Sequence, residues 1–585
     1  MSKKQKLELT WIGKDVRPKL EPRILLEDPT KSYHAKHRVS ENDIFDNRLI
    51  FGDNLLALKA LEQEFTGKIK CIYIDPPYNT GSAFESYDDG VEHSIWLSLM
   101  RERLEILWRL LSRDNGTILI SINDDECHYL KVLCDELFGR SSFVSSLVWN
   151  YEGNTDNQAK IINYHEYLLV YSKTGEIDDP GVIDPSIDPS SKLFRDEIRN
   201  TIIKNGPKNP SKEVLIPSGF PCAFEEGVLE PSEIRYPQYS ERVNVSNFQT
   251  QNNVYATTGW SSKDLLERFI QENFNEIKDS KNQLTRFEIT STGAIEAIKK
   301  REQNKGHFIS VLRGFGTTNQ MRLFLEKLGV KFTYPKPVDL ISYLIEAFSD
   351  DDDYILDSFA GSGTTAHAVM KLNKIKKTSR KFILVELREK TVNEVIIPRL
   401  KAIIDGNADA ELEPHGGGFR YYEVAPSLLN QDQWGQWVIN KEYHADMLAA
   451  AICKLEGFTF QPSAEHYWQH GFSTENDFIY VTTQTLTADQ LQALSEEVGP
   501  NRTLLVCCAA FRADESRFTN LTIKKIPKMV LSKCEWGHDD YSLNVQNLPQ
   551  APEEVSVPTP VTSGVKKQNN QQTGLFGEDD GGQHE

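Results

Sequence analysis

The sequence lacks several features that would place a protein outside the aqueous interior of a cell. It has no apolar run of the roughly 18–20 residues that a membrane-spanning helix needs. It begins with MSKKQKLELTW, whose basic residues are followed by no apolar segment, so a signal peptide is not expected. Its eight cysteines form no CxxC pair and no metal-finger spacing. We therefore expect a cytoplasmic, reduced protein without a metal ion.

Basic residues are also in short supply, because 66 Lys and Arg face 85 Asp and Glu and leave a net charge of −19. About −13 of this charge lies in residues 401–585, whereas residues 1–40 and 281–330 are each close to +5. Phosphate contacts need a local positive potential, not a basic chain as a whole. The two basic stretches either face nucleic acid or form solvated surface, and the acidic third lies away from any nucleic acid.

Apolar segments of strand length alternate with amphipathic helices in two separate parts of the chain. The first part predicts strands at 47–53, 69–75, 116–122, 146–151 and 166–172, with helices at 54–64, 93–112 and 125–138. The second predicts helices at 337–348 and 364–373 and strands at 354–363 and 381–387. Such alternation is typical of a mostly parallel sheet with helices on both faces.

The pattern between and after these parts is irregular, and it divides the chain into six segments. We expect a single α/β domain that is interrupted by an insertion and followed by a second, smaller α/β domain and a disordered tail. The predicted segments are a basic N-terminal arm (1–40), the two halves of the domain (41–173 and 331–405), the insertion (174–330), the C-terminal domain (406–548) and the tail (549–585).

The first motif with chemical content is Asp75-Pro76-Pro77-Tyr78, at the end of a strand that is expected to be buried. Ligands of an open α/β sheet bind at the carboxyl ends of its strands. The prolines stiffen the backbone there, Asp75 supplies a carboxylate, and Tyr78 supplies an aromatic face. Taken alone, the motif is also compatible with a turn that merely ends a strand.

The second motif, Asp357-Ser-Phe-Ala-Gly-Ser-Gly-Thr-Thr365, joins a predicted strand to a predicted helix. Glycines at such a place let the backbone approach a ligand at the helix N-terminus. The loop lacks the lysine of a phosphate-binding P-loop, and no Gly-x4-Gly-Lys-Ser/Thr sequence occurs, so no ATP-driven motor is expected. Glu386 ends the next strand, where a carboxylate holds ribose hydroxyls in related folds. Alternatively, the loop is a tight connection without a ligand, and Glu386 is a surface acid.

Together the two motifs resemble those of the β-class amino-methyltransferases of DNA. In that family the catalytic motif precedes the cofactor motif, and a target-recognition region lies between them. The resemblance covers about 47–173 and 331–400. It implies a Rossmann-like, S-adenosylmethionine-dependent methyltransferase fold that is circularly permuted, with residues 174–330 as the target-recognition domain.

The resemblance assigns a role to each matching residue. Asp75, Pro76, Pro77 and Tyr78 match the catalytic tetrad. Residues at the cofactor are expected to be Asp53, Lys336, Asp357, Phe359, Ala360, Gly361, Gly363, Thr364 and Glu386. Residues flanking the extruded base are expected to be Asn79, His165 and Tyr167. Candidates for reading the target sequence are Trp260, Arg286, Arg301, Arg313 and Arg322, each of which is equally compatible with a core or phosphate-contacting role.

An aspartate at the first tetrad position is typical of adenine-N6 modification in this family, whereas serine is typical of cytosine-N4 modification. The lone pair of an adenine amine is delocalised into the ring. Acceptors aimed at its N–H bonds would draw the lone pair out and stabilise the charge that develops on attack. Asp75 and the Pro76 carbonyl are expected to be these acceptors, and Tyr78 is expected to stack on the extruded adenine.

The length and the extra C-terminal domain further resemble the modification subunits of type III restriction–modification systems. The resemblance implies double-stranded DNA as substrate, a homodimer, and a separate helicase–nuclease restriction subunit as partner. The alternatives are a recognition scaffold for such a nuclease, a solitary methyltransferase, or methylation of cytosine N4, RNA or protein.

Overall fold

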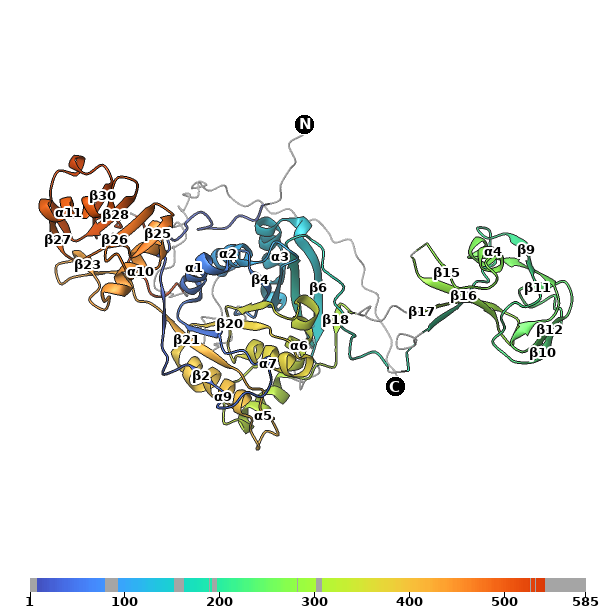
Figure 1. Ribbon diagram of the computed structural model, residues 1–585. Coiled ribbons are helices and arrows are strands. Elements are labelled where there is room, and N and C mark those ends of the chain that lie inside the picture. Colours follow the sequence, from blue (N-terminus) through green and yellow to red (C-terminus); the bar gives the residue numbers. More distant parts are fainter. Residues whose placement is uncertain are drawn as a thin grey trace, which may run out of the picture. The chain divides into compact units, whose positions relative to one another are not determined.

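The computed structural model describes residues 8–78, 93–151, 163–188, 190–191, 197–280, 282–300, 308–526, 528–531 and 533–541. The predicted disordered tail (549–585), Asn79 and Arg301 lie outside these residues. Figure 1 labels the elements along the chain.

The centre of the molecule is one 11-stranded sheet with the order β1-β21-β3-β20-β19-β4-β5-β7-β6-β18, with β2 paired to β21. Its strands are β1 (Leu25–Glu27), β2 (Tyr33–His34), β3 (Asn47–Phe51), β4 (Ile69–Ile74), β5 (Thr117–Ile122), β6 (Phe143–Asn150), β7 (His165–Ser172), β18 (Val311–Leu312), β19 (Tyr354–Asp357), β20 (Lys381–Glu386) and β21 (Gly418–Val424). The central strands from β21 to β5 pair in parallel, whereas β7 runs antiparallel to β5 and β6. The expectation of a mostly parallel α/β sheet is confirmed.

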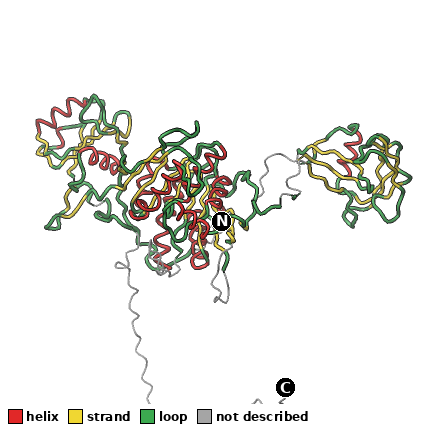
Figure 2. The backbone as a smooth tube through the Cα atoms, turned by 90° about the horizontal axis from the view of Figure 1, so that it is seen from below, coloured by secondary structure: helices red, strands yellow, loops and turns green. Residues whose placement is uncertain are grey.

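Helices cover both faces of this sheet, as Figures 1 and 2 show. One face carries α1 (Asn54–Phe65), α2 (His93–Leu110) and α3 (Asp124–Phe138). The other carries α5 (Thr318–Lys327), α6 (Val338–Phe348), α7 (Thr364–Lys376) and α9 (Ile397–Asp405), the last preceded by α8 (Glu389–Thr391) and a π-helical turn at 392–396. Since β4 and β5 are covered on both faces, nearly every residue in them is buried and most are apolar, as expected of central parallel strands.

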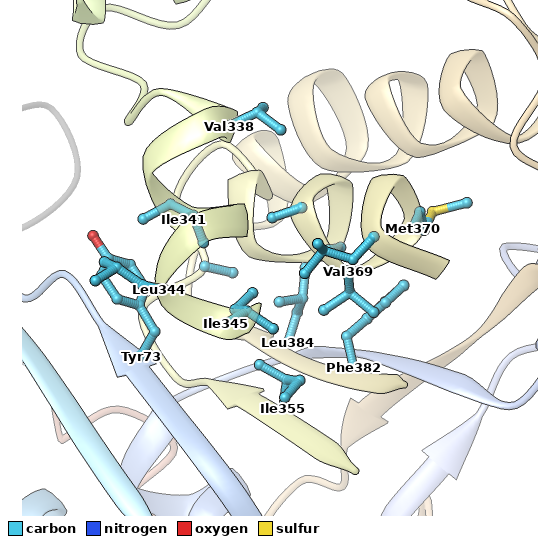
Figure 3. Packing of buried hydrophobic residues seen from close by; sticks show 14 of the residues in the cluster. Tyr73, Val338, Ile341, Leu344, Ile345, Ile355, Val369, Met370, Phe382 and Leu384 are labelled. Atoms are coloured by element: carbon cyan, nitrogen blue, oxygen red, sulfur yellow. The ribbon is translucent and has the colours of Figure 1, made fainter. Parts of the chain in front are cut away.

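Figure 3 shows the core beneath the second group of helices. Ile345 of α6 points toward Ile355 of β19 and Leu384 of β20, and Leu344 lies beside Tyr73 of β4. The apolar residues of α6 recur at helical spacing, which is why this segment forms a helix with its side chains on the sheet. The packing holds the start of α6, directly after Lys336 and Pro337, against the carboxyl edge of the sheet.

Strands β4 and β19 are hydrogen-bonded neighbours although the insertion separates them in the sequence. They run parallel, with Leu356 opposite Ile72, so both strands end at the same edge. The first motif leaves this edge at Asp75 and the second at Asp357. The pairing therefore brings the two predicted motifs together.

The insertion contains a small β-rich unit with its own core. Its elements are β8 (Glu197–Thr201), β9 (Ser211–Ile216), β10 (Gly227–Leu229), β11 (Gln238–Tyr239), β12 (Val243–Ser246), β13 (Gln249–Thr250), β14 (Val254–Gly259), α4 (Lys263–Gln271), β15 (Ile277–Lys278), β16 (Leu284–Ile289) and β17 (Ile295–Lys300). The separate core runs from Ile202 to Ala297. This unit covers fewer residues than the predicted insertion (174–330). Strand β18 pairs with β6, and Met321 and Leu325 of α5 pack in the core of the large domain.

The C-terminal unit is also smaller than predicted, because β21 continues the large sheet. The unit contains β22 (Leu429–Gln431), β23 (Trp437–Ile439), α10 (Ala445–Glu456), β24 (Thr459–Phe460), β25 (Gly471–Thr474), β26 (Asp477–Val481), β27 (Thr485–Thr487), α11 (Ala488–Val498), β28 (Thr503–Cys508), β29 (Ala510–Arg512) and β30 (Leu521–Lys525). Its five-stranded sheet has the order β24-β25-β26-β28-β30. No helix among the described residues combines the length and the apolar character that a bilayer crossing requires.

Two basic residues of the N-terminal arm, Lys14 and Arg17, contact acidic residues of the large domain. Lys14 pairs with Glu136 at 2.8 Å, and Arg17 pairs with Glu102 at 2.8 Å and Glu105 at 2.6 Å. These ion pairs neutralise part of the positive charge that the sequence suggested could face nucleic acid.

Replacing Ile345 by alanine tests the packing of α6 on the sheet. Ile345 is fully buried, so Ile345→Ala should lower the free energy of unfolding by about 2–5 kcal/mol, measured by urea denaturation. Ile375→Ala on α7 is the matched control, since Ile375 is 61% exposed, and it should change stability by less than about 0.5 kcal/mol. Equal losses in the two variants would contradict the assignment of this core.

Candidate active site

Four side chains from three separate segments form a hydrogen-bonded cluster at the end of β4. The Tyr78 hydroxyl donates to Asp75 Oδ1 at 2.7 Å and also lies 2.9 Å from Glu166 Oε2. The Lys336 ammonium lies 3.1 Å from Asp75 Oδ2, 3.0 Å from Glu166 Oε2 and 2.8 Å from the Tyr78 hydroxyl. Glu166 comes from β7 and Lys336 from the turn before α6, so the cluster joins both halves of the sheet domain.

The cluster holds two carboxylates against one ammonium, and this balance sets the protonation of its members. Burial alone would favour the neutral amine of Lys336, but Asp75 and Glu166 raise its pKa above the ordinary value, so it remains charged. Burial and the same two carboxylates raise the pKa of Tyr78 well above the ordinary value, so its hydroxyl keeps its proton. The three charged groups sum to −1, which suits a site where positive charge develops.

Aromatic side chains enclose and stiffen the tetrad. The Trp96 indole N–H donates to the Pro77 carbonyl at 2.8 Å, and Trp96 is almost fully buried, so this hydrogen bond fixes the backbone of the tetrad. The Lys336 ammonium lies 4.9 Å from the centre of the Tyr78 ring and 5.8 Å from that of Trp149. Pro76 is buried, whereas Asp75, Pro77 and Tyr78 are half-buried.

The glycine loop is organised by two buried carboxylates. Asp357 accepts from the Phe359 N–H at 3.0 Å and the Thr365 hydroxyl at 2.6 Å, and Glu386 accepts from the Gly361 N–H at 2.9 Å. Burial raises the pKa of both Asp357 and Glu386 to about 7. Phe359 and Ala360 are buried, and the Ala360 N–H donates to the Val385 carbonyl at 3.1 Å.

Both glycines of the loop have left-handed backbone angles, with φ of +52° at Gly361 and +76° at Gly363. A side chain disfavours these angles, which explains why glycine occurs at both positions. Helix α7 begins directly after Gly363, so its unpaired N–H groups point toward the loop. The buried hydroxyl of Thr364 donates to the Lys336 carbonyl at 3.3 Å and so links the loop to the tetrad cluster.

Arg399 of α9 lies beneath the loop and was not predicted. It is fully buried and donates to the Ser362 carbonyl at 2.9 Å and to the Thr364 hydroxyl at 3.1 Å. Burial lowers its pKa to about 9, and within the described part of the chain no acidic side chain pairs with it. A buried cation below a helix N-terminus gives the loop a positive potential.

Asp53 caps the N-terminus of α1 at the end of β3. Its Oδ1 accepts from the Leu55 and Leu56 N–H groups at 2.8 and 3.1 Å. Its Oδ2 accepts from the Tyr541 N–H at 2.9 Å and lies 3.4 Å from Arg103. The neighbouring Asn54 amide donates to the Ser358 carbonyl at 2.9 Å, which connects this strand end to the glycine loop.

The predicted site residues therefore fall into one connected group and a few outlying ones. The tetrad, Lys336 and the loop residues are linked by the contacts above, although Lys336 directs its ammonium at Asp75 and only its carbonyl at the loop. His165 and Tyr167 lie on β7, where His165 Nε2 is 3.1 Å from the Tyr167 hydroxyl. Glu166 between them reaches the cluster and was missed as a site residue.

The candidates for target reading have different surroundings. Trp260 is buried and donates to the Lys212 carbonyl at 2.8 Å, so it is a core residue of the β-rich unit. Arg286 is held by both oxygens of Glu197, at 2.7 and 3.0 Å. Arg322 pairs with Glu326 at 2.5 Å, and Arg313 is exposed.

The loop meets the requirements of a nucleoside cofactor with a charged tail. Glu386 offers a carboxylate for hydroxyl groups, and the left-handed glycines expose backbone at the helix N-terminus. Within the described part of the chain, the buried Ser358 hydroxyl and the Arg399 Nε have no hydrogen-bond partner, which leaves polar capacity at the loop for a ligand. The described residues contain no group of three or more His, Cys, Asp or Glu side chains able to hold a metal ion.

Comparison with known proteins identifies the class to which this site belongs. A family model described as DNA methylase matches residues 69–397, from β4 through both motifs to the start of α9. This is more than half of the chain, and the protein therefore belongs to the DNA methylase family. The methyl donor of this class is S-adenosylmethionine.

The similarity to particular relatives covers more of the chain than the family model does. The chain is 26% identical to the type III restriction–modification enzyme EcoP15I Mod subunit of Escherichia coli, over 85% of each chain. It is 27% identical to the EcoPI Mod subunit of Escherichia phage P1, over 89% of this chain and 90% of that one. Among solved structures, the complex of M1.HpyAVI with SAM is 12% identical and covers 60% of this chain and 99% of that one, with a TM-score of 0.27.

Replacing Gly363 by alanine tests the loop as the cofactor site. A Cβ at this left-handed residue would lie 3.3 Å from Ile396 Cγ2, so Gly363→Ala should cost about 1–2 kcal/mol and weaken S-adenosylmethionine binding about tenfold or more, measured by calorimetry. Gly435→Ala is the matched control, because Gly435 has the same φ of +76° with open space around it. The control should lose stability but bind the cofactor normally, and equal binding by both variants would contradict the assignment.

Proposed function

We propose that this DNA methyltransferase transfers a methyl group from S-adenosylmethionine to N6 of adenine in double-stranded DNA. The observation that carries the proposal is the carboxylate of Asp75, held at the shared edge of β4 and β19 beside the glycine loop. In the proposed reaction the Asp75 carboxylate and the Pro76 carbonyl accept hydrogen bonds from the two N–H groups of the amine. The lone pair is thereby directed at the methyl donor.

The remaining site residues hold the base and the cofactor. Tyr78 stacks on the extruded adenine, and Asn79, His165 and Tyr167 flank it. Gly361 and Gly363 let the backbone approach the cofactor, Glu386 accepts from its ribose hydroxyls, and Phe359 packs on it. Asp53 lies near its adenine ring, provided that the Tyr541 N–H releases the carboxylate. The cofactor would supply a methyl group on a positively charged sulfur. The bond from N6 to the methyl carbon would form as the sulfur–methyl bond breaks, the neutral thioether would leave, and the methylated amine would lose one proton to water. No cysteine nucleophile is required.

The order of the motifs supports a circularly permuted version of the methyltransferase fold. The catalytic strand β4 precedes the cofactor strand β19 in the chain, yet the two lie side by side. The separate β-rich core between them, from Ile202 to Ala297, is the proposed target-recognition module. In the sequence, this module lies between the segment that carries the tetrad and the segment that carries the glycine loop.

We further propose that the chain is the modification and recognition subunit of a type III-like restriction–modification system. The support is similarity to the EcoP15I and EcoPI Mod subunits over at least 85% of this chain and of theirs. Under this proposal the protein acts as a homodimer and joins a separate helicase–nuclease subunit. Co-purification from cells that express both, followed by light scattering of the free subunit, tests these two assemblies.

Replacing Asp75 by alanine tests the proposed chemistry. The wild-type protein should transfer labelled methyl groups from S-adenosylmethionine into duplex DNA, and hydrolysed DNA should contain N6-methyladenine. Asp75→Ala should lower the rate by at least about 100-fold, because it removes an acceptor needed in the transition state. Its melting temperature should remain near that of the wild type. Full activity of this variant, or N4-methylcytosine as the product, would show the proposal to be wrong.

The raised pKa of Glu386 predicts weaker cofactor binding in acid. Ribose hydroxyls donate to the carboxylate form, and only about a tenth of Glu386 is ionised one pH unit below a pKa of about 7. The dissociation constant for S-adenosylmethionine should therefore rise by roughly tenfold between pH 8 and pH 6. Glu386→Gln should bind more weakly at pH 8 and lose most of this pH dependence.

Unfolding cannot account for this acid effect, since the sign of the linkage is opposite. A carboxyl whose pKa is raised on folding takes up protons in the folded state, so its contribution to stability increases as pH falls from 7 toward 4. A pH slope in Glu386→Gln equal to that of the wild type would assign the titration to another group, with Asp357 the first to test.

A further inference from the structure

Both oxygens of Asp75 already have donors within the protein. Oδ1 accepts from the Tyr78 hydroxyl at 2.7 Å, and Oδ2 faces the Lys336 ammonium at 3.1 Å. An ammonium this close neutralises much of the carboxylate charge, and it opposes the positive charge that would develop on the target amine. Asp75 is therefore a poor acceptor for that amine in the arrangement observed.

Glu166 is a second acceptor for the same two donors. Its Oε2 lies 2.9 Å from the Tyr78 hydroxyl and 3.0 Å from the Lys336 ammonium. The hydroxyl of Tyr78 has a single proton, so it can donate fully to Asp75 or to Glu166 but not to both. The cluster therefore has two arrangements, with the donors directed at one carboxylate or at the other.

The position of Glu166 suits the second arrangement. Glu166 lies on β7, which pairs with β5 on one side and β6 on the other, so its backbone is fixed. Only 16% of its side chain is exposed, and the side chain of Lys336 is 9% exposed. A carboxylate at this depth needs a positively charged partner, and Lys336 can supply it without help from Asp75.

We propose that Glu166 is a positioning residue of the methyl transfer. It takes the Lys336 ammonium and the Tyr78 hydroxyl, which releases the charge and the lone pairs of Asp75 to accept from the target amine. The inference rests on the proposed function and adds to it a second carboxylate, which acts through Lys336 and Tyr78 without touching the base. Without Glu166, Lys336 stays on Asp75 and competes with the substrate.

Single-turnover methylation of duplex DNA by Glu166→Ala and Glu166→Gln tests this role. Glu166→Ala should slow methyl transfer by about 100-fold, whereas its dissociation constant for S-adenosylmethionine should stay within about twofold of the wild type. Glu166→Gln keeps the shape and one acceptor oxygen but lacks the charge, so its rate should lie between those of the alanine variant and the wild type. Wild-type rates in both variants would overturn the proposal.

Glu62→Gln is the matched control. Glu62 is a carboxylate outside the site that pairs with Lys59 and Arg109, each at 2.6 Å. It should methylate at the wild-type rate. Loss of cofactor binding or of melting temperature in Glu166→Gln would show a general structural role for Glu166 and would also overturn the proposal.

A double-mutant cycle with Lys336→Met separates positioning from independent action. If Glu166 acts by holding the ammonium, Glu166→Ala should slow the Lys336→Met protein by less than about threefold. A further 100-fold loss in the double variant would show that Glu166 acts on its own and would contradict the inference. Failure of the proposed function gives a different result, since the wild-type protein would then transfer no methyl group to adenine in DNA.

Discussion

The parallel pairing of β4 with β19 is the interaction on which the rest of the site depends. Each strand alone ends in a motif with an ordinary structural explanation, a stiff turn after β4 and a tight connection after β19. Paired in register, they place Asp75 and the glycine loop at one edge of one sheet. Helix α6 then packs across both strands and fixes Lys336, whose ammonium reaches the tetrad and whose carbonyl reaches the loop. A single pattern of hydrogen bonds thus assembles a site from residues far apart in the sequence.

Local patterns were sufficient to predict the central strands from β3 to β7, β19 and β20, the helices α1, α2, α3, α6 and α7, and the two motifs, because each of these depends on residues a few positions apart. Contacts between distant segments were not predictable in this way. The period of β7 indicates a strand but not that Glu166, in place of His165 or Tyr167, points at Asp75. Likewise, the sequence around Arg399 does not distinguish it from other arginines of amphipathic helices. Its contact with the glycine loop follows only from the packing of α9. The ends of the insertion and of the C-terminal unit were misplaced because β18, α5 and β21 join the large domain only through long-range pairing and packing.

Buried ionisable groups gather around this edge, and they make the large domain less stable than an apolar core would. Asp357 and Glu386 are held by hydroxyl and backbone N–H groups, and Arg399 by oxygen atoms of the loop. Such groups are costly to bury without an opposite charge. Asp357 and Glu386 lie at the carboxyl ends of β19 and β20, where a site for a polar and charged cofactor would place such groups.

The order of strands also bears on how the protein is made. Among the residues that the structure describes, β3 pairs with β20 and β21 alone, and β4 acquires its second partner when β19 has been synthesised. About 280 residues separate β4 from β19, which at ordinary rates of translation is roughly 15–60 s. During that time the nascent chain carries open strand edges, which favour aggregation. The β-rich unit, whose core contains no residue of the large sheet among those described, can fold in this interval. The β-rich unit can thus be folded while the chain is still on the ribosome and β19, β20 and β21 of the large sheet have yet to be made.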